Sequence, residues 1–440
     1  MTTTSTRSPD LLSVEAARDL VLAAIPAALP AEEVPTDEAL GRVLAAAVIA
    51  TTDLPPWDNS AMDGYALRSA DTAGATESVP VRLAVVGDVR AGVAPEVTVT
   101  PGVAVRIATG APLPPGSDAV VPVEETTPLD QGGPPGPRGR DATGPLPAAC
   151  LVHVAVRPGG SVRRAGDDLR AGSQVLEAGT ALAPAGIAIA AGSGNGWLSV
   201  TRRPRVAVLA TGDEVRPAGA VLGPAGIPDA NGPGLAALVA DAGGDAIRLG
   251  VATDVLADVL GRLRTAIAEG ADAIIVSGGV SVGPYDVVKL AFDALGRIDL
   301  WRVAVQPGKP FAFGTAERPG GGPPILLFGL PGNPVSGFVT FELFVRPALR
   351  RLAGRRDLLR PTDRGVLADP VSKSHGRRAF LRVVGGERDE RGRVRVRLAG
   401  GQGSHVLSAL AAADALAIVP EDVDDLPADT EVEIWWLDRA

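Results

Sequence analysis

The sequence predicts a multidomain protein of the α/β plus β class, with a doubly wound α/β domain in the middle of the chain and a β-barrel at its end. The chain has 440 residues, and single domains rarely exceed about 250, so two to four domains are expected. Between residues 203 and 350, short apolar runs alternate with helical patterns, which is typical of a mostly parallel sheet covered by helices. After residue 350 the apolar residues alternate with a period of two, as in antiparallel strands.

The N-terminal part of the chain has a weaker pattern. Residues 11–47 read as helical, residues 53–167 as short strands with many Pro/Gly turns, and residues 168–202 as β-like sequence. The low-complexity stretch 127–147 reads as an insert that forms a mobile surface loop. The uncharged run 178–201 is long enough to cross a bilayer, but proline, asparagine and glycine interrupt it. We interpret this run as buried loop and strand.

Composition excludes several classes of protein. Acidic residues outnumber basic ones by 51 to 42, which gives a net charge of −9, and the basic residues form no cluster of the kind that follows a nucleic-acid backbone. The single cysteine, Cys150, excludes an internal disulfide, and the three histidines (His153, His375 and His405) lack zinc-ligand spacing. The first residues lack the apolar core of a secretory signal. We therefore expect a cytoplasmic protein that binds neither nucleic acid nor a membrane.

Five apolar runs in the α/β region are predicted to be strands: residues 205–211, 245–253, 271–279, 298–305 and 323–331. A helix is predicted after the second run, because one face collects Val255, Leu256, Val259, Leu260, Leu263 and Ile267. In a doubly wound sheet, ligands bind at the C-terminal ends of the strands. Motifs that follow these runs are therefore candidate site residues.

Alternating runs near the C-terminus predict a small barrel or sandwich. They read RRAFLRVV, RVRVRLAG, DALAIVP and TEVEIWWL, with polar turns between them. Each places apolar side chains on one face of a strand and polar ones on the other.

The stretch SGGVSVGPYD, residues 277–286, has the glycines and the strand-to-helix setting of an anion-binding loop. Its first and last glycines match the frame of a Walker A loop, but Pro284 and Tyr285 replace the required Lys and Ser/Thr. An ordinary P-loop nucleotidase is therefore disfavoured. A tight turn with Asp286 in the first turn of the next helix is an equally good interpretation.

Acidic residues follow the other strands. TGDE (211–214) follows the first and Asp254 the second, so both should lie on the same sheet edge as Asp286. Acids beside an anion loop are explained if a divalent cation bridges them to phosphate. Taken singly, each is better explained as a helix-capping residue, but their convergence favours function.

Two further loops are candidates for binding an anion. Lys309 in QPGKP follows the fourth strand, with Arg302 nearby, and both are equally well explained as solvated charges. PGNPVSG (331–337) enters a helix and is either an anion site or a proline-shaped turn. Asp63 in DNSAMDGYA and Thr109 in RIATGAPLPPGSDAVV lie in turn-rich segments that physical chemistry alone does not assign.

Eight motifs, in order, resemble the molybdopterin molybdenumtransferase family, the MoeA type, which is related to the E domains of gephyrin and its plant counterpart. They are DNSAMDGYA, RIATGAPLPPGSDAVV, VRRAGDDL, TGDEV, SGGVSVGPYD, QPGKPFAFG, GLPGNPVSG and GSHVLSAL. Together they cover nearly the whole chain from residue 11. SGGVSVG alone would indicate only the wider molybdopterin-binding fold.

The resemblance implies four domains and an elongated homodimer. The implied domains are a split helical and β domain at 11–52 and 168–202, an inserted mixed α+β lobe at 53–167, an α/β molybdopterin-binding domain at 203–350, and a β-barrel at 351–440. The implied cleft combines the α/β domain of one subunit with the inserted lobe of the other. A further implied partner is the molybdopterin adenylyltransferase.

The implied reaction transfers molybdate to adenylylated molybdopterin with Mg²⁺ and releases AMP and molybdenum cofactor. Matching motifs assign catalytic positions to Asp63, Thr109, Glu214, Asp254 and Asp286. Of these, Glu214 and Asp286 are assigned to the metal and pyrophosphate region. Substrate-binding positions fall on Asp168, Gly278, Gly279, Ser281, Gly283, Arg302, Lys309, Arg377, Arg382 and Ser404.

The chain departs from some relatives where Arg302 and Gln306 stand in place of lysines. Arginine still grips an oxyanion with two hydrogen bonds, whereas glutamine offers only a neutral amide. Tungstate therefore remains open as the metal anion. A binding or scaffolding protein that keeps the fold without the chemistry is the alternative of another class. It predicts lost acids, whereas the acidic residues of the motifs are all retained.

Overall fold

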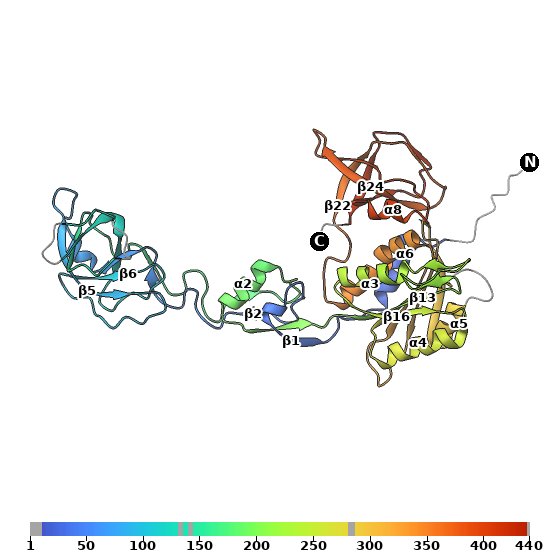
Figure 1. Ribbon diagram of the computed structural model, residues 1–440, viewed down its shortest axis with the longest axis horizontal. Coiled ribbons are helices and arrows are strands. Elements are labelled where there is room, and N and C mark those ends of the chain that lie inside the picture. The colour runs from blue at the N-terminus through green and yellow to red at the C-terminus, as the bar shows by residue number, and fades with distance from the viewer. Residues whose placement is uncertain (1–10, 131–134, 140–143, 280–286, 438–440) are drawn as a thin grey trace, which may run out of the picture.

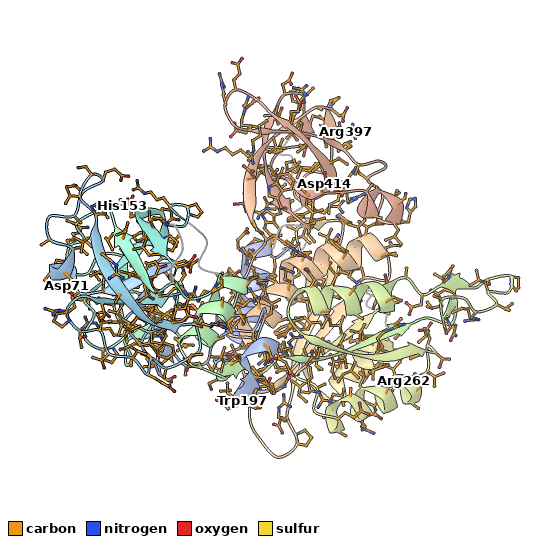
Figure 2. All side chains as sticks on the ribbon, turned by 60° about the vertical axis from the view of Figure 1, so that its left-hand side comes forward. Asp71, His153, Trp197, Arg262, Arg397 and Asp414 are labelled. Carbon is orange, nitrogen blue, oxygen red and sulfur yellow. The ribbon has the colours of Figure 1, made fainter. Side chains whose placement is uncertain are left out.

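The computed structural model describes residues 11–130, 135–139, 144–279 and 287–437. The molecule is elongated, with a strand-rich lobe at one end, a small middle unit, and an α/β unit carrying a barrel at the other end (Figure 1). Turned by 60°, the lobe with Asp71 and His153 is separate from the barrel with Arg397 and Asp414 (Figure 2). The α/β plus β class predicted from the sequence is confirmed.

The α/β unit is built on one six-stranded sheet in the order β16-β13-β17-β21-β20-β18. Its strands are β13 (Arg205–Thr211), β16 (Asp245–Ala252), β17 (Ala273–Ser277), β18 (Gly296–Arg302), β20 (Pro310–Ala316) and β21 (Ile325–Leu330). The first four in spatial order pair in parallel, and β20 and β18 complete the sheet in antiparallel fashion. The strand predicted at 298–305 is divided, because β19 (Val305–Gln306) leaves the sheet to pair with the barrel. Strand β20 was missed by the sequence analysis.

Helices cover both faces of this sheet, as a doubly wound fold requires. One face is covered by α1 (Val14–Ala23), α3 (Asn231–Asp241), α6 (Pro334–Thr340) and α7 (Arg346–Leu352), and the other by α4 (Leu256–Ala268) and α5 (Val287–Asp293). Successive strand residues point to opposite faces, so Val206 and Val208 enter one core while Ala207 and Leu209 enter the other. Helix α1, from the start of the chain, therefore packs on the α/β unit.

The C-terminal region is a closed barrel, which decides between the barrel and the sandwich. Its strands are β22 (Thr362–Leu367), β24 (Arg378–Arg388), β25 (Val394–Leu398), β26 (Ala415–Val419) and β28 (Glu431–Trp436). They pair in the order β24-β25-β22-β28-β26, and β26 pairs back to β24. Its short elements are α8 (Leu407–Ala411), β23 (Val371–Ser372) and β27 (Asp425–Leu426). In β25, Val394 and Val396 are buried in the barrel core and Arg395 and Arg397 are exposed.

The lobe is a six-stranded sheet in the order β7-β4-β6-β5-β9-β8. Its elements are β4 (Gly64–Leu67), η2 (Ser69–Thr72), β5 (Val81–Val89), β6 (Val103–Ile107), β7 (Ala119–Pro122), η3 (Val123–Glu125), β8 (Thr126–Leu129) and β9 (Ala149–Val152). The described part of the 127–147 insert is attached to this lobe rather than a free surface loop. It begins as β8, and Arg138 forms ion pairs with Glu77 and Glu125.

The middle unit corrects two predictions. Its elements are β1 (Ala31–Pro35), η1 (Thr36–Glu38), β2 (Val48–Ile49), β11 (Gln174–Leu176), α2 (Pro184–Gly192) and β12 (Trp197–Thr201). The short strands β3 (Asn59–Ser60) and β10 (Val162–Arg163) pair with each other and pack on the lobe. The helix predicted over 11–47 ends at Ala23, because prolines follow and β1 pairs with β12. The uncharged run contains helix α2, where Pro184 occupies the favourable first turn. Among the residues described, none of the helices is both long and apolar enough to cross a membrane.

A buried ion network joins the barrel to the α/β unit. Glu342, in the π-helical turn η4 (Phe341–Val345), is 1% exposed and accepts two 2.9 Å hydrogen bonds from Arg360. Arg360 also donates to Asp241 on α3 and to the carbonyl of Leu437, which follows β28. Burial alone would lower the pKa of Arg360, but its bonds to Glu342 raise it overall. Three segments from distant parts of the chain thus meet at one guanidinium.

We expect Glu342→Gln to lower the free energy of unfolding by about 3–5 kcal/mol, because it leaves two buried arginines, Arg346 and Arg360, with only the half-exposed Asp241 as an acid partner. Denaturant titration followed by the fluorescence of Trp435 and Trp436 in the barrel measures the change. The control is Glu431→Gln, since Glu431 forms a half-exposed pair with Arg393 and its loss should cost at most about 1 kcal/mol. Equal stabilities of the two variants would contradict the prediction.

Candidate functional site

A cavity of about 1150 Å³ opens at the C-terminal edge of the α/β sheet. Thr211 at the end of β13, Ser277 at the end of β17, and Pro331 just after β21 all line it. This is the edge at which the sequence analysis expected ligands, because the C-terminal ends of parallel strands lie together.

Two glycines of the predicted anion loop line this cavity, and both are required by local packing. Gly278 has φ +96°, and an added Cβ would lie 2.7 Å from the carbonyl oxygen of Thr211. Gly279 has φ +61°, and its Cβ would lie 2.7 Å from the side chain of Val288 on α5. Only glycine fits both the backbone angle and the space. Three other predicted residues of this loop, Ser281, Gly283 and Asp286, lie outside the described residues.

The acidic loops meet at the same edge. The backbone N–H of Asp254 donates to Asp213 Oδ1 at 3.1 Å, and the N–H of Asp213 lies 3.4 Å from Asp254 Oδ2. Glu214 and Asp254 both line the cavity and are exposed. The described residues contain no group of three or more His, Cys, Asp or Glu side chains arranged to hold a metal ion. One or two carboxylates still suit Mg²⁺, which completes its coordination with water and substrate phosphates.

Two cationic side chains, those of Arg302 and Lys309, also line the cavity. Arg302, the last residue of β18, pairs in register with Pro310 of β20, which places Lys309 beside it. Both charged side chains are exposed and line the cavity, as predicted. Gln306 does not line it. It pairs with Ala379 on barrel strand β24, and its Oε1 is buried with no hydrogen bond from the described residues.

The barrel contributes a loop to the cavity through Arg382, which is 1% exposed. The Nη2 of Arg382 donates to the carbonyls of Gly401 and Gly403 at 3.1 and 3.2 Å, and its backbone N–H donates to Gln402 Oε1 at 2.9 Å. Burial lowers the pKa of Arg382 from its ordinary value. The guanidinium lies behind the loop and positions it.

This loop brings Ser404 and His405 to the α/β unit. Ser404 Oγ accepts a 3.2 Å hydrogen bond from Asn333, which lies in the PGNP turn, and His405 lines the cavity. Arg377, half-buried at the start of the same barrel motif, does not line the cavity. Of the three barrel residues predicted, Ser404 thus contacts the PGNP turn, Arg382 supports the barrel loop that carries Ser404, and Arg377 does neither.

Two cavity residues were missed by the sequence analysis. Asn231 begins α3, and its Nδ2 donates to Ser277 Oγ at 2.6 Å and to the carbonyl of Gly332 at 2.7 Å. Asp229 lies two residues earlier and is 4% exposed. The signal for them in the sequence was the polar PDAN stretch before an apolar helical pattern. This stretch reads as a surface turn, because the short strands before it, β14 (Val215–Arg216) and β15 (Ile227–Pro228), are not evident from the sequence.

Three predicted residues lie away from this cavity in the same chain. Asp63 Oδ1 accepts hydrogen bonds from the N–H and the Oγ1 of Thr109 at 2.7 and 2.9 Å, so these two motifs do meet. They belong to the lobe around β4 and β6, at the far end of the molecule (Figure 1). The backbone N–H of Asp168 donates to the carbonyl of Leu54 between the lobe and the middle unit.

Three family models match successive parts of the chain. They are the MoeA N-terminal region (domain I and II) at residues 12–194, the probable molybdopterin binding domain at 207–351, and the MoeA C-terminal region (domain IV) at 364–437. Molybdopterin molybdenumtransferase 2 of Mycobacterium tuberculosis is 39% identical over 92% of this chain and 94% of its own length. The chain belongs to the molybdopterin molybdenumtransferase family.

Other members of the molybdopterin molybdenumtransferase family agree with this assignment. The molybdopterin molybdenumtransferase of Haemophilus influenzae is 32% identical over 96% of this chain and 98% of its own. The solved structure of the molybdopterin biosynthesis MoeA protein from Pyrococcus horikoshii matches with a TM-score of 0.76 and 31% identity, covering 97% of this chain and 99% of that one. The resemblance predicted from the motifs is confirmed, and the chain is a transferase of molybdenum cofactor biosynthesis.

We expect Gly278→Ala to lower the free energy of unfolding by about 1–3 kcal/mol, because its Cβ meets backbone and its φ is positive. Gly234→Ala on α3 is the matched control, since nothing lies within 4 Å of its added Cβ. Alanine in a helix should leave stability unchanged or raise it by up to about 1 kcal/mol. Denaturant titration of both variants measures the difference, and a Gly278→Ala protein as stable as the control would refute it.

Proposed function

We propose that this chain is a molybdenum insertase, which transfers molybdate to adenylylated molybdopterin and releases AMP and molybdenum cofactor. The proposal is carried by the meeting of a glycine loop, two exposed acids and two exposed cations at one cavity of a molybdopterin molybdenumtransferase. A substrate with a pyrophosphate link and an oxyanion co-substrate needs N–H donors and cations, together with acids that bind a divalent ion.

In this proposal the residues of the site have distinct roles. Gly278 and Gly279 contact phosphate or pterin, and Arg302 and Lys309 neutralise anionic oxygens. Glu214 would hold Mg²⁺ together with Asp286, which lies outside the described residues, and Asp254 supports the Glu214 loop through its bonds to Asp213. Mg²⁺ supplies charge neutralisation at the pyrophosphate, a role that requires no separate general base.

Purified protein should release AMP from adenylylated molybdopterin only when both Mg²⁺ and molybdate are present. Glu214→Gln and Asp254→Asn should each reduce this rate at least about 100-fold, the scale on which one charged transition-state contact acts. Glu387→Gln is the control, because Glu387 is exposed on the barrel strand β24 away from the cavity. Chromatographic measurement of AMP tests this. Absence of AMP release by folded wild-type protein would refute the enzyme and favour the scaffolding alternative.

We propose that the working form is a homodimer in which the lobe of one chain completes the cavity of the other. The proposal is supported by the position of the lobe, which lies at the other end of the chain from the α/β unit that carries the cavity (Figure 1). Asp63 and Thr109 are bonded to each other and exposed, so a second copy can present them together.

Mixing two inactive variants tests this arrangement. Asp63→Ala and Asp254→Asn chains, mixed at equal amounts after dissociation, should regain about one quarter of wild-type activity, because half of the dimers are mixed and each has one intact site. The comparison is a mixture of Asp254→Asn with Glu214→Gln, which lie in the same cavity and should not complement. Complementation in neither mixture would show that each chain works alone.

The proposal also includes a cellular location, a partner protein and the metal anion. We place the protein in the cytoplasm, with the molybdopterin adenylyltransferase as the partner that supplies substrate. The reason for considering tungstate was Gln306 in place of a lysine, but Gln306 does not line the cavity, so we keep molybdate as the proposed anion. Replacing molybdate by tungstate in the AMP assay distinguishes the two anions.

A further inference from the structure

The corner of the cavity next to α3 presents hydrogen-bond acceptors and adjoins the glycine loop through Ser277. Asn231 and Asp229, at the N-terminus of this 11-residue helix, both line the cavity. Neither carries a role in the function proposed above.

The amide of Asn231 has only one possible orientation. The carbonyl oxygen of Gly332 can only accept, so the group 2.7 Å from it must be the Nδ2 amide. The same Nδ2 lies 2.6 Å from Ser277 Oγ, so both of its hydrogens are used inside the protein. Asn231 Oδ1 accepts no hydrogen bond from the described residues, and it is the part of the amide left for a ligand.

Asp229 adds a buried negative charge behind this acceptor. Its Oδ1 accepts a 2.8 Å hydrogen bond from the N–H of Gly232, which caps α3. Its Oδ2 is buried and accepts no hydrogen bond in the described part of the chain, and the Nη2 of half-exposed Arg248 lies 3.7 Å away. A Cβ on Gly232 would lie 2.4 Å from this Oδ2, so glycine leaves the carboxylate its space. An incompletely paired buried charge gives this corner a negative potential.

We propose that Asn231 Oδ1, in the field of Asp229, accepts a hydrogen bond from the amino edge of the pterin ring. This rests on the proposed function and fixes how the substrate lies in the cavity. A pterin carries donors at its 2-amino group and N3–H, whereas phosphate oxygens at neutral pH only accept. The acceptor corner therefore takes the pterin and repels the pyrophosphate, which lies toward the cations Arg302 and Lys309.

Two simple probes test the proposal: 6-hydroxymethylpterin and 6-hydroxymethyllumazine. Both carry N3–H, but the first has a 2-amino donor and an unprotonated N1 where the second has a 2-oxo acceptor and N1–H, so the pair tests the 2-amino group as the donor to Asn231. Wild-type protein should bind the pterin about 10- to 100-fold more tightly, the range for one hydrogen bond assisted by charge. Pteridine fluorescence measures both dissociation constants. Asn231→Ala should reduce the ratio to about threefold or less. Asp229→Asn should give an intermediate ratio, because it keeps the cap to Gly232 but removes the charge.

Two controls separate recognition from structure. Ser277→Ala removes one tether of the Asn231 amide but keeps its Oδ1, so both affinities should fall while their ratio is kept. Arg248→Gln removes the cation near Asp229 and should leave the ratio unchanged or raise it. The proposal is overturned if wild-type protein binds the two probes equally, if it shows no saturable pterin binding at millimolar concentration, or if Asn231→Ala keeps the ratio.

The AMP-release assay distinguishes failure of this inference from failure of the proposed function. Turnover of adenylylated molybdopterin without a preference for pterin would refute the pterin corner and leave the insertase intact. A preference for pterin without turnover would do the reverse.

Discussion

Parallel pairing of four strands is the constraint on which the site depends. Strands β16, β13, β17 and β21 run in one direction, so the loops that follow them all emerge at one edge of the sheet. The acids Glu214 and Asp254, the glycine loop and the PGNP turn are each more than 20 residues apart in the sequence, yet they line one cavity. Within that edge, the Asn231 amide links the loop after β17 to the loop after β21. The backbone of Gly278 packs against Thr211 without space for a side chain.

The barrel is held so that it can complete this edge. Arg360 binds Glu342 and Asp241 of the α/β unit while also binding the carbonyl of Leu437 after the last barrel strand. Arg382 then orders the loop that brings His405 to the cavity. Both arginines are buried, and both use their fixed planar array of donors to join segments that are far apart in the sequence. Burying these two charged side chains costs free energy, and here they hold the barrel in place on the α/β unit.

Local sequence patterns predict secondary-structure elements, whereas the roles of individual side chains depend on contacts between residues that are far apart in the sequence. Five of the six strands of the α/β sheet, the shared edge, and the placement of Arg302 and Lys309 follow from apolar periodicity and connection rules. The positions of Asn231 and Arg382 do not, because their partners are fixed only when the chain has folded. Asn231 bonds residues 46 and 101 positions away. Helix α2 was missed for a different reason, since a uniformly apolar run has no period from which a helix can be recognised.

The charged side chains that line the cavity favour one arrangement of its ligands. Its described lining carries three carboxylates, on Glu214, Asp229 and Asp254, but only two permanent cations, on Arg302 and Lys309. A pyrophosphate and an oxyanion placed at random in such a cavity would be repelled, because Coulomb energies at about 4 Å reach several kcal/mol near a protein surface. The repulsion is avoided if the polyanion stays between the glycine loop and the cations, with a divalent ion at Glu214. In the proposed orientation the acceptors beside α3 face the amino edge of the pterin rather than the pyrophosphate, so a single charge pattern would both admit the substrate and set its direction.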